Sequence, residues 1–300
     1  MTTPRIRLHL GAHKTATTYL QARLELNAKL LASQGVAFWP INNVRPLFHQ
    51  AWAESEGTSR SEKLKALSGR PTRLDKLGSK ITSLFDTSDE LLVSEENLLG
   101  ETGEFLDGAF YPTAISRLSL LSTFLPDRPL DIWLCIRSYP DFLASIYGEA
   151  IRFSPVPPPE QFASAFSSPQ GAWLQIIDDI RDALPHANVF IWRYEDFRDL
   201  EPRILEGLSD VEAEAFEPLQ NPTVRGSASD SAIRAMAETA EPLSATEWRF
   251  RMAALEHEYP VQSAQDRFSP WPENQFRKMQ QDYVSDLSAI EARADITFIH

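Results

Sequence analysis

A lysine lies shortly after an apolar segment near the start of the chain, in the run Leu8-His-Leu-Gly-Ala-His-Lys-Thr-Ala-Thr-Thr-Tyr-Leu20. Gly11 ends the apolar segment, and Lys14 lies in the short loop after it. Three hydroxyl residues stand where a helix is expected to begin: Thr15, Thr17 and Thr18. A helix start presents unpaired N–H groups and the positive end of the helix dipole. The spacing therefore predicts a loop that binds phosphate or sulfate.

The loop departs from the standard P-loop, G-x-x-x-x-G-K-[ST], because His13 precedes Lys14 and His9 stands five residues before it. It resembles the 5′-phosphosulfate loop, G-x-x-K-[ST]-G-[ST]-[ST], of the sulfotransferases that use 3′-phosphoadenosine-5′-phosphosulfate (PAPS). The resemblance implies that six residues bind this donor: His13, Lys14, Thr15, Ala16, Thr17 and Thr18. Ala16 replaces the family's usual Gly or Ser, and its methyl group is costly if the backbone there has a positive φ.

A second pattern lies in Trp133-Leu-Cys-Ile-Arg-Ser-Tyr-Pro-Asp-Phe-Leu-Ala-Ser-Ile-Tyr147. Arg137 ends a predicted strand, and Ser145 lies eight residues later in the predicted helix that follows. A guanidinium matches the shape of a phosphate, and a hydroxyl adds a neutral donor. The pair resembles the Arg and Ser that bind the donor's 3′-phosphate in the same family.

Three weaker resemblances to the family follow the same order along the chain. They are a central strand with a polar pair, a late strand with Tyr-Glu-Asp, and the loop before the last helices of bacterial members: Leu92-Val-Ser-Glu-Glu96, Phe190-Ile-Trp-Arg-Tyr-Glu-Asp-Phe197 and Asn221-Pro-Thr-Val-Arg-Gly226. The chain thus resembles a bacterial member of the PAPS-dependent sulfotransferases.

The resemblance implies in-line transfer of a sulfuryl group from PAPS to a hydroxyl or amine of a carbohydrate, lipid or small molecule. By analogy with phosphoryl transfer, Lys14 and the loop N–H groups would stabilise charge on the leaving phosphate. No metal is expected, because the leaving group is good and the sequence contains no metal-ligand spacing.

A base must take the acceptor's proton near neutral pH, and two residues are candidates. His49 lies after the first strand–helix–strand unit, where several bacterial relatives carry a histidine, and histidine titrates near neutral pH. Glu95 follows a central strand, near the position of the base in cytosolic members, and some carbohydrate-modifying members use a carboxylate. His49 could equally be a hydrogen-bonded loop residue, and Glu95 a helix cap.

Two other functions stay open. A P-loop kinase or nucleoside triphosphatase could hold magnesium at the end of the strand before Glu95, although a Ser stands where an Asp is usual and the glycine before Lys14 is missing. A nucleotide-binding module could keep the pocket without turnover. Five aromatic residues could line an acceptor cleft or belong to the core: Trp39, Phe48, Trp52, Phe153 and Trp173.

Short apolar segments alternate with helical periodicity along the chain. Strands are expected at 3–10, 36–39, 90–94, 131–136 and 188–192. Helices are expected at 17–34, 74–85, 113–124, 140–152, 171–184, 196–207, 229–240, 245–257 and 273–293. Residues 40–70 are predicted to be irregular and polar. This order predicts an α/β fold in which a central, mostly parallel β-sheet is flanked by helices, a three-layer sandwich like that of P-loop NTPases. We expect one sulfotransferase domain over 1–300, with an α/β core in 1–227 and a helical region in 228–300.

The chain carries a formal net charge of −13, from 29 Lys and Arg against 42 Asp and Glu. This balance argues against a general nucleic-acid or anionic-membrane binder, which needs a basic face. No apolar run is long enough to cross a bilayer, and the first residues do not resemble a secretory signal, so a cytoplasmic location is expected. Cys135, the one cysteine, is expected to be a buried strand residue.

Overall fold

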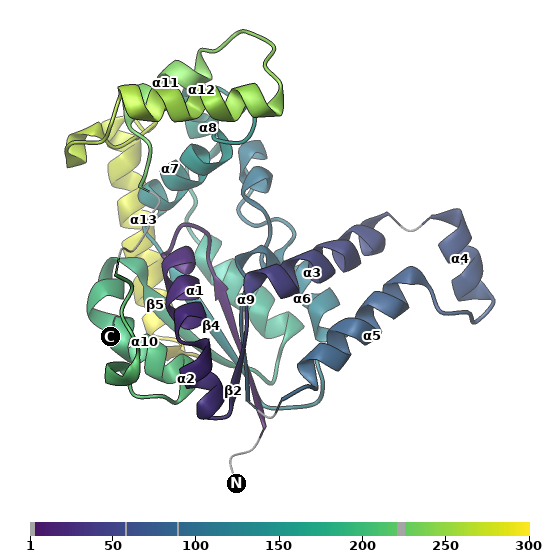
Figure 1. Cartoon of the computed structure of the whole chain (residues 1–300). Coiled ribbons are helices and arrows are strands. Elements are labelled where there is room, and N and C mark those ends of the chain that lie inside the picture. The colour runs from purple at the N-terminus through teal and green to yellow at the C-terminus, as the bar shows by residue number, and fades with distance from the viewer. Residues whose placement is uncertain (1–3, 58, 89, 221–225) are drawn as a thin grey trace.

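The computed structural model describes residues 4–57, 59–88, 90–220 and 226–300 of the chain (Figure 1). A six-stranded sheet with the strand order β2-β3-β1-β4-β5-β6 forms its centre. Every neighbouring pair of strands is parallel. The strands are β1 (Arg5–Gly11), β2 (Val36–Trp39), β3 (Glu90–Ser94), β4 (Leu130–Ile136), β5 (Asn188–Arg193) and β6 (Thr297–Phe298).

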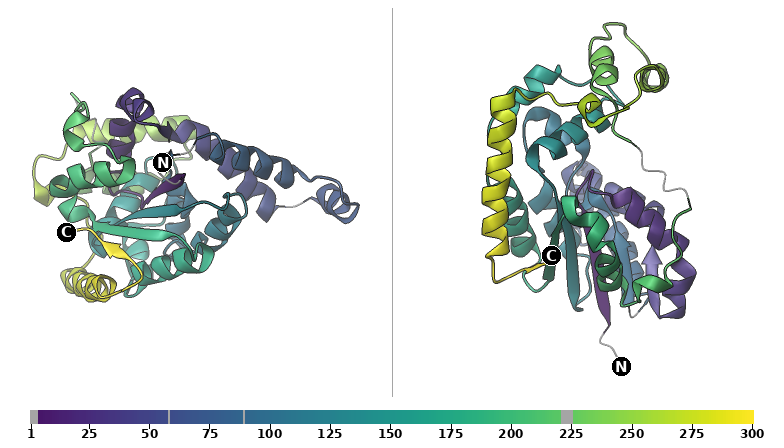
Figure 2. Two further views of the ribbon diagram at one scale, coloured as in Figure 1. Left: turned by 90° about the horizontal axis from the view of Figure 1, so that it is seen from below. Right: turned by 90° about the vertical axis from the view of Figure 1, so that its left-hand side faces the viewer.

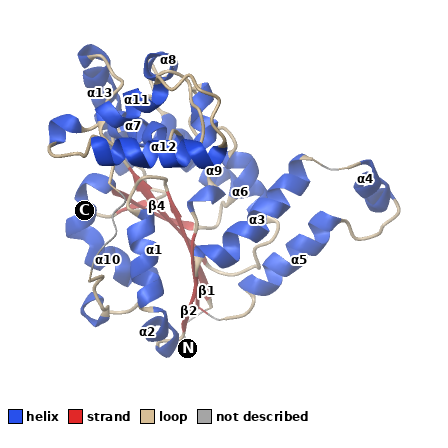
Figure 3. Ribbon diagram, turned by 45° about the horizontal axis from the view of Figure 1, so that its top comes forward, coloured by secondary structure: helices blue, strands red, loops and turns tan. Residues whose placement is uncertain are grey.

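Helices cover both faces of the sheet (Figure 3). One apolar layer joins the sheet to α1 (Thr17–Leu26), α2 (Ala28–Ser33) and α10 (Phe197–Ser209). The other layer joins it to α3 (Ile41–Glu56), α5 (Arg73–Phe85), α6 (Ala114–Ser122), α7 (Tyr139–Ala150), α9 (Ala172–Ala183) and α13 (Glu273–Glu291). Figure 2 shows α13 running along the outside of the second layer. The predicted three-layer α/β fold is confirmed.

Side chains alternate between the two layers along each strand. In β1, Ile6, Leu8 and Leu10 belong to the layer of α3 and α5. In β4, Trp133 and Cys135 belong to the layer of α1 and α10. Because the sheet is covered on both faces, the central strands β1, β3 and β4 are buried after their first residue, as parallel strands usually are. The buried position of Cys135 is confirmed.

The remaining helices lie at the margins of the sandwich. α8 (Pro159–Ala165), α11 (Asp230–Ala237) and α12 (Ala245–Glu258) form a cap above the carboxyl edge of the sheet (Figures 1 and 3). The described residues also form short 3-10 helices, namely η1 (Glu96–Leu98), η2 (Thr102–Asp107), η3 (Tyr194–Asp196), η4 (Ala213–Ala215) and η5 (Ala264–Asp266). No helix in the described part of the chain is both long and apolar enough to cross a bilayer.

The prediction that residues 40–70 are irregular is wrong. They contain α3 and α4 (Arg60–Leu67). Pro46 lies inside α3, and a proline usually indicates the end of a helix, because it removes one backbone hydrogen bond. Helix α3 forms nonetheless, because Phe48 and Ala51 pack into the core.

Three smaller differences concern the ends of elements. The predicted helix 17–34 is interrupted at Asn27, whose side-chain amide donates to the Arg23 carbonyl at 2.8 Å. Such a bond competes with the regular helix pattern. Helix α8 was not predicted, because it begins in a run of three prolines, 157–159, that indicated a loop. The region 228–300 is not only helical, because β6 pairs with β5.

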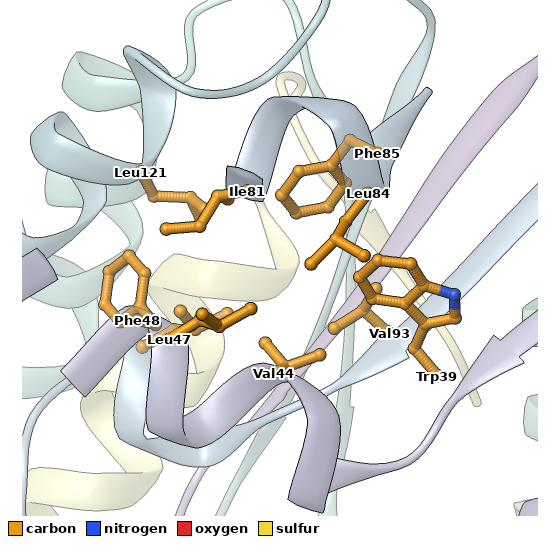
Figure 4. Close-up of a pocket in the computed structure, with 10 residues that line it drawn as sticks. Trp39, Val44, Leu47, Phe48, Ile81, Leu84, Phe85, Val93 and Leu121 are labelled. Carbon is orange, nitrogen blue, oxygen red and sulfur yellow. The ribbon is translucent and has the colours of Figure 1, made fainter. Parts of the chain in front are cut away.

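Helices α3 and α5 extend sideways from the sheet and carry α4 at their far end (Figure 1). We call residues 41–85 the arm. Its base encloses a cavity of about 20 Å³, which is lined only by apolar side chains (Figure 4). The lining residues are Trp39, Val44, Leu47, Phe48, Ile81, Leu84, Phe85, Val93, Leu98 and Leu121. The cavity has room for little more than one water molecule, so it is a packing gap rather than a ligand site.

Candidate active site

The central strand β1 ends between the ends of β3 and β4, where the sheet order reverses. The chain leaves β1 toward β2 and β3 on one side, and β4 and β5 extend the sheet on the other. Ligands of open parallel sheets bind outside the carboxyl ends of the strands at this kind of position. Gly11, Glu95 and Arg137 lie at the three strand ends. The topology therefore brings the loop after β1, the polar pair after β3 and Arg137 after β4 to the carboxyl edge of the sheet.

The loop after β1 is closed by its own threonines. The hydroxyls of Thr15 and Thr17 both donate to the Ala12 carbonyl, at 2.6 and 2.9 Å. Gly11 has a φ of 87°, and a Cβ there would lie 3.1 Å from the Cβ of Glu96 and 3.2 Å from the Thr17 hydroxyl. A larger residue than glycine is therefore strained at this position. The two buried hydroxyls shape the loop, whereas Thr18 is exposed in the first turn of α1.

Two residues of the loop have a left-handed backbone. The φ angles are 59° at Lys14 and 65° at Ala16. Such a conformation costs a non-glycine residue roughly 1–2 kcal/mol. The methyl group of Ala16 is therefore costly, because the backbone φ at this position is positive. It is also the N-cap of α1, and no side chain among the described residues caps this helix, so the first N–H groups stay available for an anion.

Two cations, Lys14 and Arg152, share one carboxylate beside the loop, and a third, Arg137, lies next to Lys14. Lys14 Nζ lies 3.0 Å from Glu149 Oε2, and Arg152 Nη1 lies at the same distance from that oxygen. Arg137 Nη1 donates to the Lys14 carbonyl at 2.7 Å, and its guanidinium stacks on Tyr194 at 4.4 Å. Burial lowers the pKa of Lys14. The charge of Glu149 opposes this shift, whereas the charges of Arg152 and Arg137 add to it. The cluster holds more positive than negative charge.

Ser145, Glu149 and Arg152 are spaced four and three residues apart, so they share one face of the chain at and beyond α7. Ser145 is half-buried there. Arg152 is 7 % exposed and also donates to Glu256 and to the Gly226 carbonyl. Beside it is a pocket of about 200 Å³, lined by Arg152, Gly226, Ser227, Ala228, Ser229, Glu256, Tyr259 and Val261. No motif in the sequence distinguished Arg152.

The segment after β5 fixes the position of Arg137. Tyr194 lies under the guanidinium, and Glu195 accepts a hydrogen bond from the backbone N–H of Ser138 at 2.9 Å. The indole of Trp173 donates to the Arg137 carbonyl at 2.9 Å. These contacts give the Tyr-Glu-Asp segment a positioning role. The segment 221–226 resembles the loop before the last helices of bacterial sulfotransferases, and its residues 221–225 lie outside the described residues.

His13 is buried below the loop. Its Nδ1 lies 2.8 Å from the Tyr111 hydroxyl and its Nε2 lies 3.1 Å from Asn97 Oδ1. Its backbone N–H also donates to Tyr111, at 3.0 Å. Burial lowers the pKa of His13, although Glu96 opposes this. His13 therefore anchors the loop through its ring, and its own N–H is already engaged.

Glu95, one of the two candidate bases, is bound on both oxygens by Arg45. The Arg45 Nε lies 3.0 and 2.9 Å from the two oxygens, and Nη2 lies 2.7 Å from the first. The backbone N–H of Asn97 donates to the same carboxylate, which is 1 % exposed. Burial raises the pKa of Glu95, while Arg45 lowers it. Arg45 also reaches Glu96 at 3.0 Å. Arg45 was missed because it lies in the segment predicted to be irregular.

His49, the other candidate, lies one helical turn after Arg45 on the same face of α3. Its side chain is 62 % exposed, and its Nδ1 lies 3.4 Å from Glu101 Oε1. Of the two candidates, His49 is thus the accessible one.

The five aromatic residues do not form one cleft. Trp173 is fully buried, and Trp39 and Phe48 line the cavity at the base of the arm. Trp52 lies under the Arg117 guanidinium at 4.6 Å, and Phe153 is 42 % exposed.

Acidic side chains that could share a metal ion come together, within the described residues, only at Glu206, Glu212 and Glu214. Asp210, close by in the chain, is bound by Arg7 near the start of β1. The cluster therefore lies toward the amino edge of the sheet, away from the loop.

No family model matches this chain, and no curated protein is significantly similar to it.

Proposed function

We propose that the chain is a PAPS-dependent sulfotransferase. The observation that carries this proposal is the convergence of Lys14, Arg137 and Arg152 beside the uncapped start of α1. A site with three cations, of which only Lys14 and Arg152 share the Glu149 carboxylate, suits a ligand that carries two separate anionic groups. PAPS carries a 5′-phosphosulfate and a 3′-phosphate.

Each anionic group has its own candidate residues. The 5′-phosphosulfate would bind the N–H groups at the start of α1 and the Lys14 ammonium. The 3′-phosphate would bind Arg137 and Ser145, with a fork of guanidinium donors on one side and a hydroxyl on the other. Glu149 now holds Lys14, so donor binding exchanges one anionic partner of that lysine for another.

The transfer is a single displacement. A lone pair of the acceptor oxygen forms a bond to sulfur, and the bond from sulfur to the 5′-phosphate oxygen breaks with its electrons remaining on that oxygen. The acceptor proton passes to the imidazole of His49. Lys14 stabilises the charge on the leaving oxygen. The products are a sulfate ester and adenosine 3′,5′-bisphosphate. An amine acceptor would follow the same course through nitrogen.

The first experiment separates donor classes by thermal stabilisation. Adenosine 3′,5′-bisphosphate should raise the melting temperature more than ATP with magnesium does at equal concentration. The kinase alternative needs carboxylates for magnesium, but Arg45 binds both Glu95 and Glu96 at the strand end. Equal stabilisation by ATP with magnesium would count against sulfuryl transfer.

The second experiment tests the 3′-phosphate site. Arg137→Ala should weaken PAPS binding by about 1.5–3 kcal/mol and leave adenosine phosphosulfate, which lacks the 3′-phosphate, nearly unchanged. Arg193→Ala is the matched control, because this arginine ends the neighbouring strand but is already paired with Asp196. If both ligands weaken equally, Arg137 has only a structural role.

The third experiment concerns turnover, scored as added sulfate mass on a panel of hydroxyl and amine acceptors. Lys14→Met should lower kcat more than it raises the donor Kd, because the leaving charge develops in the transition state. Donor binding without product from any acceptor would favour a binding module.

The base is tested with saturating donor. His49→Ala should lower kcat by about 10²–10⁴-fold with donor affinity kept. His186→Ala, an exposed histidine just before β5, is the control. Loss of turnover in Glu95→Gln, with His49→Ala fully active, would assign the base to Glu95 instead.

A further inference from the structure

The outer part of the arm is positively charged, although the whole chain has a negative net charge. Residues 59–80 contain seven basic and two acidic side chains, a net charge of +5, whereas the rest of the chain has 22 basic and 40 acidic side chains, a net charge of −18. All seven basic residues are exposed: Arg60, Lys63, Lys65, Arg70, Arg73, Lys76 and Lys80. An acidic protein therefore presents one basic projection.

The helix at the end of the arm also exposes apolar side chains. Leu64 is 60 % exposed and Leu67 is 85 % exposed, and α4 has no buried residue. With eight residues, α4 is shorter than the roughly 12–15 that an isolated helix needs in water. A surface that covers these leucines would stabilise it.

Cations and leucines share one face of α4. Arg60, Lys63, Leu64 and Leu67 are spaced three and four residues apart, so they lie side by side. Glu62 lies on the opposite face, where it accepts from the Arg73 N–H at 2.7 Å and pairs with Lys65. These bonds attach α4 to the start of α5 and leave the mixed face directed outward.

We propose that this face of α4, with the basic residues of the arm around it, binds the surface of an anionic lipid bilayer. A segment that exposes cations beside leucines offers both contacts that a membrane interface accepts, because anionic headgroups attract the cations and the acyl boundary takes up apolar side chains. The phosphates of the lipid headgroups pair with the cations, and the acyl region covers the two leucines. A soluble polyanion would satisfy the charge but leave the leucines in water.

The projection of the arm makes this binding compatible with the acidic body. Helix α4 lies beyond the ends of α3 and α5, away from the sheet (Figure 1). At physiological ionic strength, charges separated by more than about 8 Å are largely screened. Repulsion between the body and the bilayer is therefore weak when the tip of the arm makes the contact.

Sedimentation of the full chain with vesicles tests this proposal. We compare pure phosphatidylcholine with vesicles that contain about 30 % phosphatidylglycerol, across about 50–500 mM NaCl. Binding should require the anionic lipid and weaken as salt rises. Arg60→Gln/Lys63→Gln should lower the partition coefficient about thirtyfold. Leu64→Ser/Leu67→Ser should lower it about tenfold or more with the salt dependence kept.

The control is Lys29→Gln/Arg198→Gln, which removes two exposed cations outside the arm and should bind like the unmodified chain. Because α4 contributes nothing to the core, all variants should unfold at nearly the same temperature. Equal binding to neutral and anionic vesicles would overturn the proposal, as would arm variants that bind normally. Leucine variants with unchanged vesicle binding would show that only charge attracts the arm to the vesicles and would overturn the part of the proposal in which the acyl region covers the leucines. A dimer that the arm variants abolish, without vesicle binding, would assign it to a second copy of the chain.

Discussion

His9 should make the protein lose stability in mild acid. It lies in β1, two residues before the loop, and is 1 % exposed. Its Nδ1 lies 2.7 Å from the Ser94 hydroxyl, and its ring stacks on Trp192 at 5.7 Å. Burial lowers the pKa of His9 from 6.5 to about 4, although Glu96 opposes the shift. The folded protein therefore keeps this ring neutral where the unfolded chain protonates it.

The size and the sign of the effect follow from linkage. Below pH 6.5 the unfolded state binds a proton that the folded state does not bind, so the free energy of unfolding falls as pH falls. The contribution is present above pH 6.5 and is lost progressively as pH falls to about 4. With 1.36 kcal/mol per pH unit, the loss is about 2 kcal/mol at pH 5 and about 3 kcal/mol at most.

Urea unfolding at pH 7.5 and pH 5 measures this loss. The unmodified chain should lose about 2 kcal/mol more than His9→Gln does between the two pH values. The difference isolates His9, because His13 and the carboxylates titrate in both proteins. His186→Gln, which removes an exposed histidine, should behave like the unmodified chain. Equal losses with and without His9 would refute the reasoning. If His9→Gln does not fold, a ring titration of His9 by NMR with a midpoint above 6 would refute it as well.

Three further predictions concern packing and the loop. Gly207→Ala should destabilise the protein by about 1–3 kcal/mol in urea unfolding, because a Cβ would lie 2.1 Å from the Trp133 ring; no measurable change would contradict the packing described. Ala16→Gly should raise the free energy of unfolding by up to about 1 kcal/mol, because glycine relieves the positive φ, and a decrease would count against a left-handed residue there. Arg45→Met should cost about 2–3 kcal/mol by leaving the buried Glu95 carboxylate unpaired. The double variant Arg45→Met/Glu95→Gln should recover part of that loss, and a double variant no more stable than Arg45→Met would show that the ion pair is not the cause.

The fold could be predicted because its signals are local. Apolar runs bounded by turn residues give the strands, and helical periodicity gives most helices. The pattern that predicts an anion-binding loop is likewise local, since Gly11, Lys14 and the threonines lie within eight residues. Parallel pairing then places the ends of β1 and β4 at one edge without further information, which is why Arg137 could be predicted to lie beside the loop.

The parts that could not be predicted depend on contacts between distant segments. Arg45 reaches Glu95 across fifty residues, and nothing in its neighbourhood distinguishes it from a surface arginine. The same holds for Arg152, whose partners come from α7, from residue 226 and from α12. Nothing in the sequence indicated that the hydroxyls of Thr15 and Thr17 donate to the Ala12 carbonyl, a bond by which a tight loop satisfies its own buried oxygen. That these threonines bind the donor stays a prediction.

Glu149 explains how the cation cluster can exist without a ligand. Lys14 and Arg152 both contact one of its oxygens at 3.0 Å, and their charges lower its pKa despite its burial. Without that carboxylate, the Lys14 ammonium would lose its attraction to Glu149 while the repulsion from Arg137 and Arg152 remained, at a partly buried site. A bound dianion offers the same cations more negative charge than Glu149 does. On the proposed function, Glu149 thus holds Lys14 in place before the donor arrives, and it remains beside Arg152 once the donor has taken Lys14.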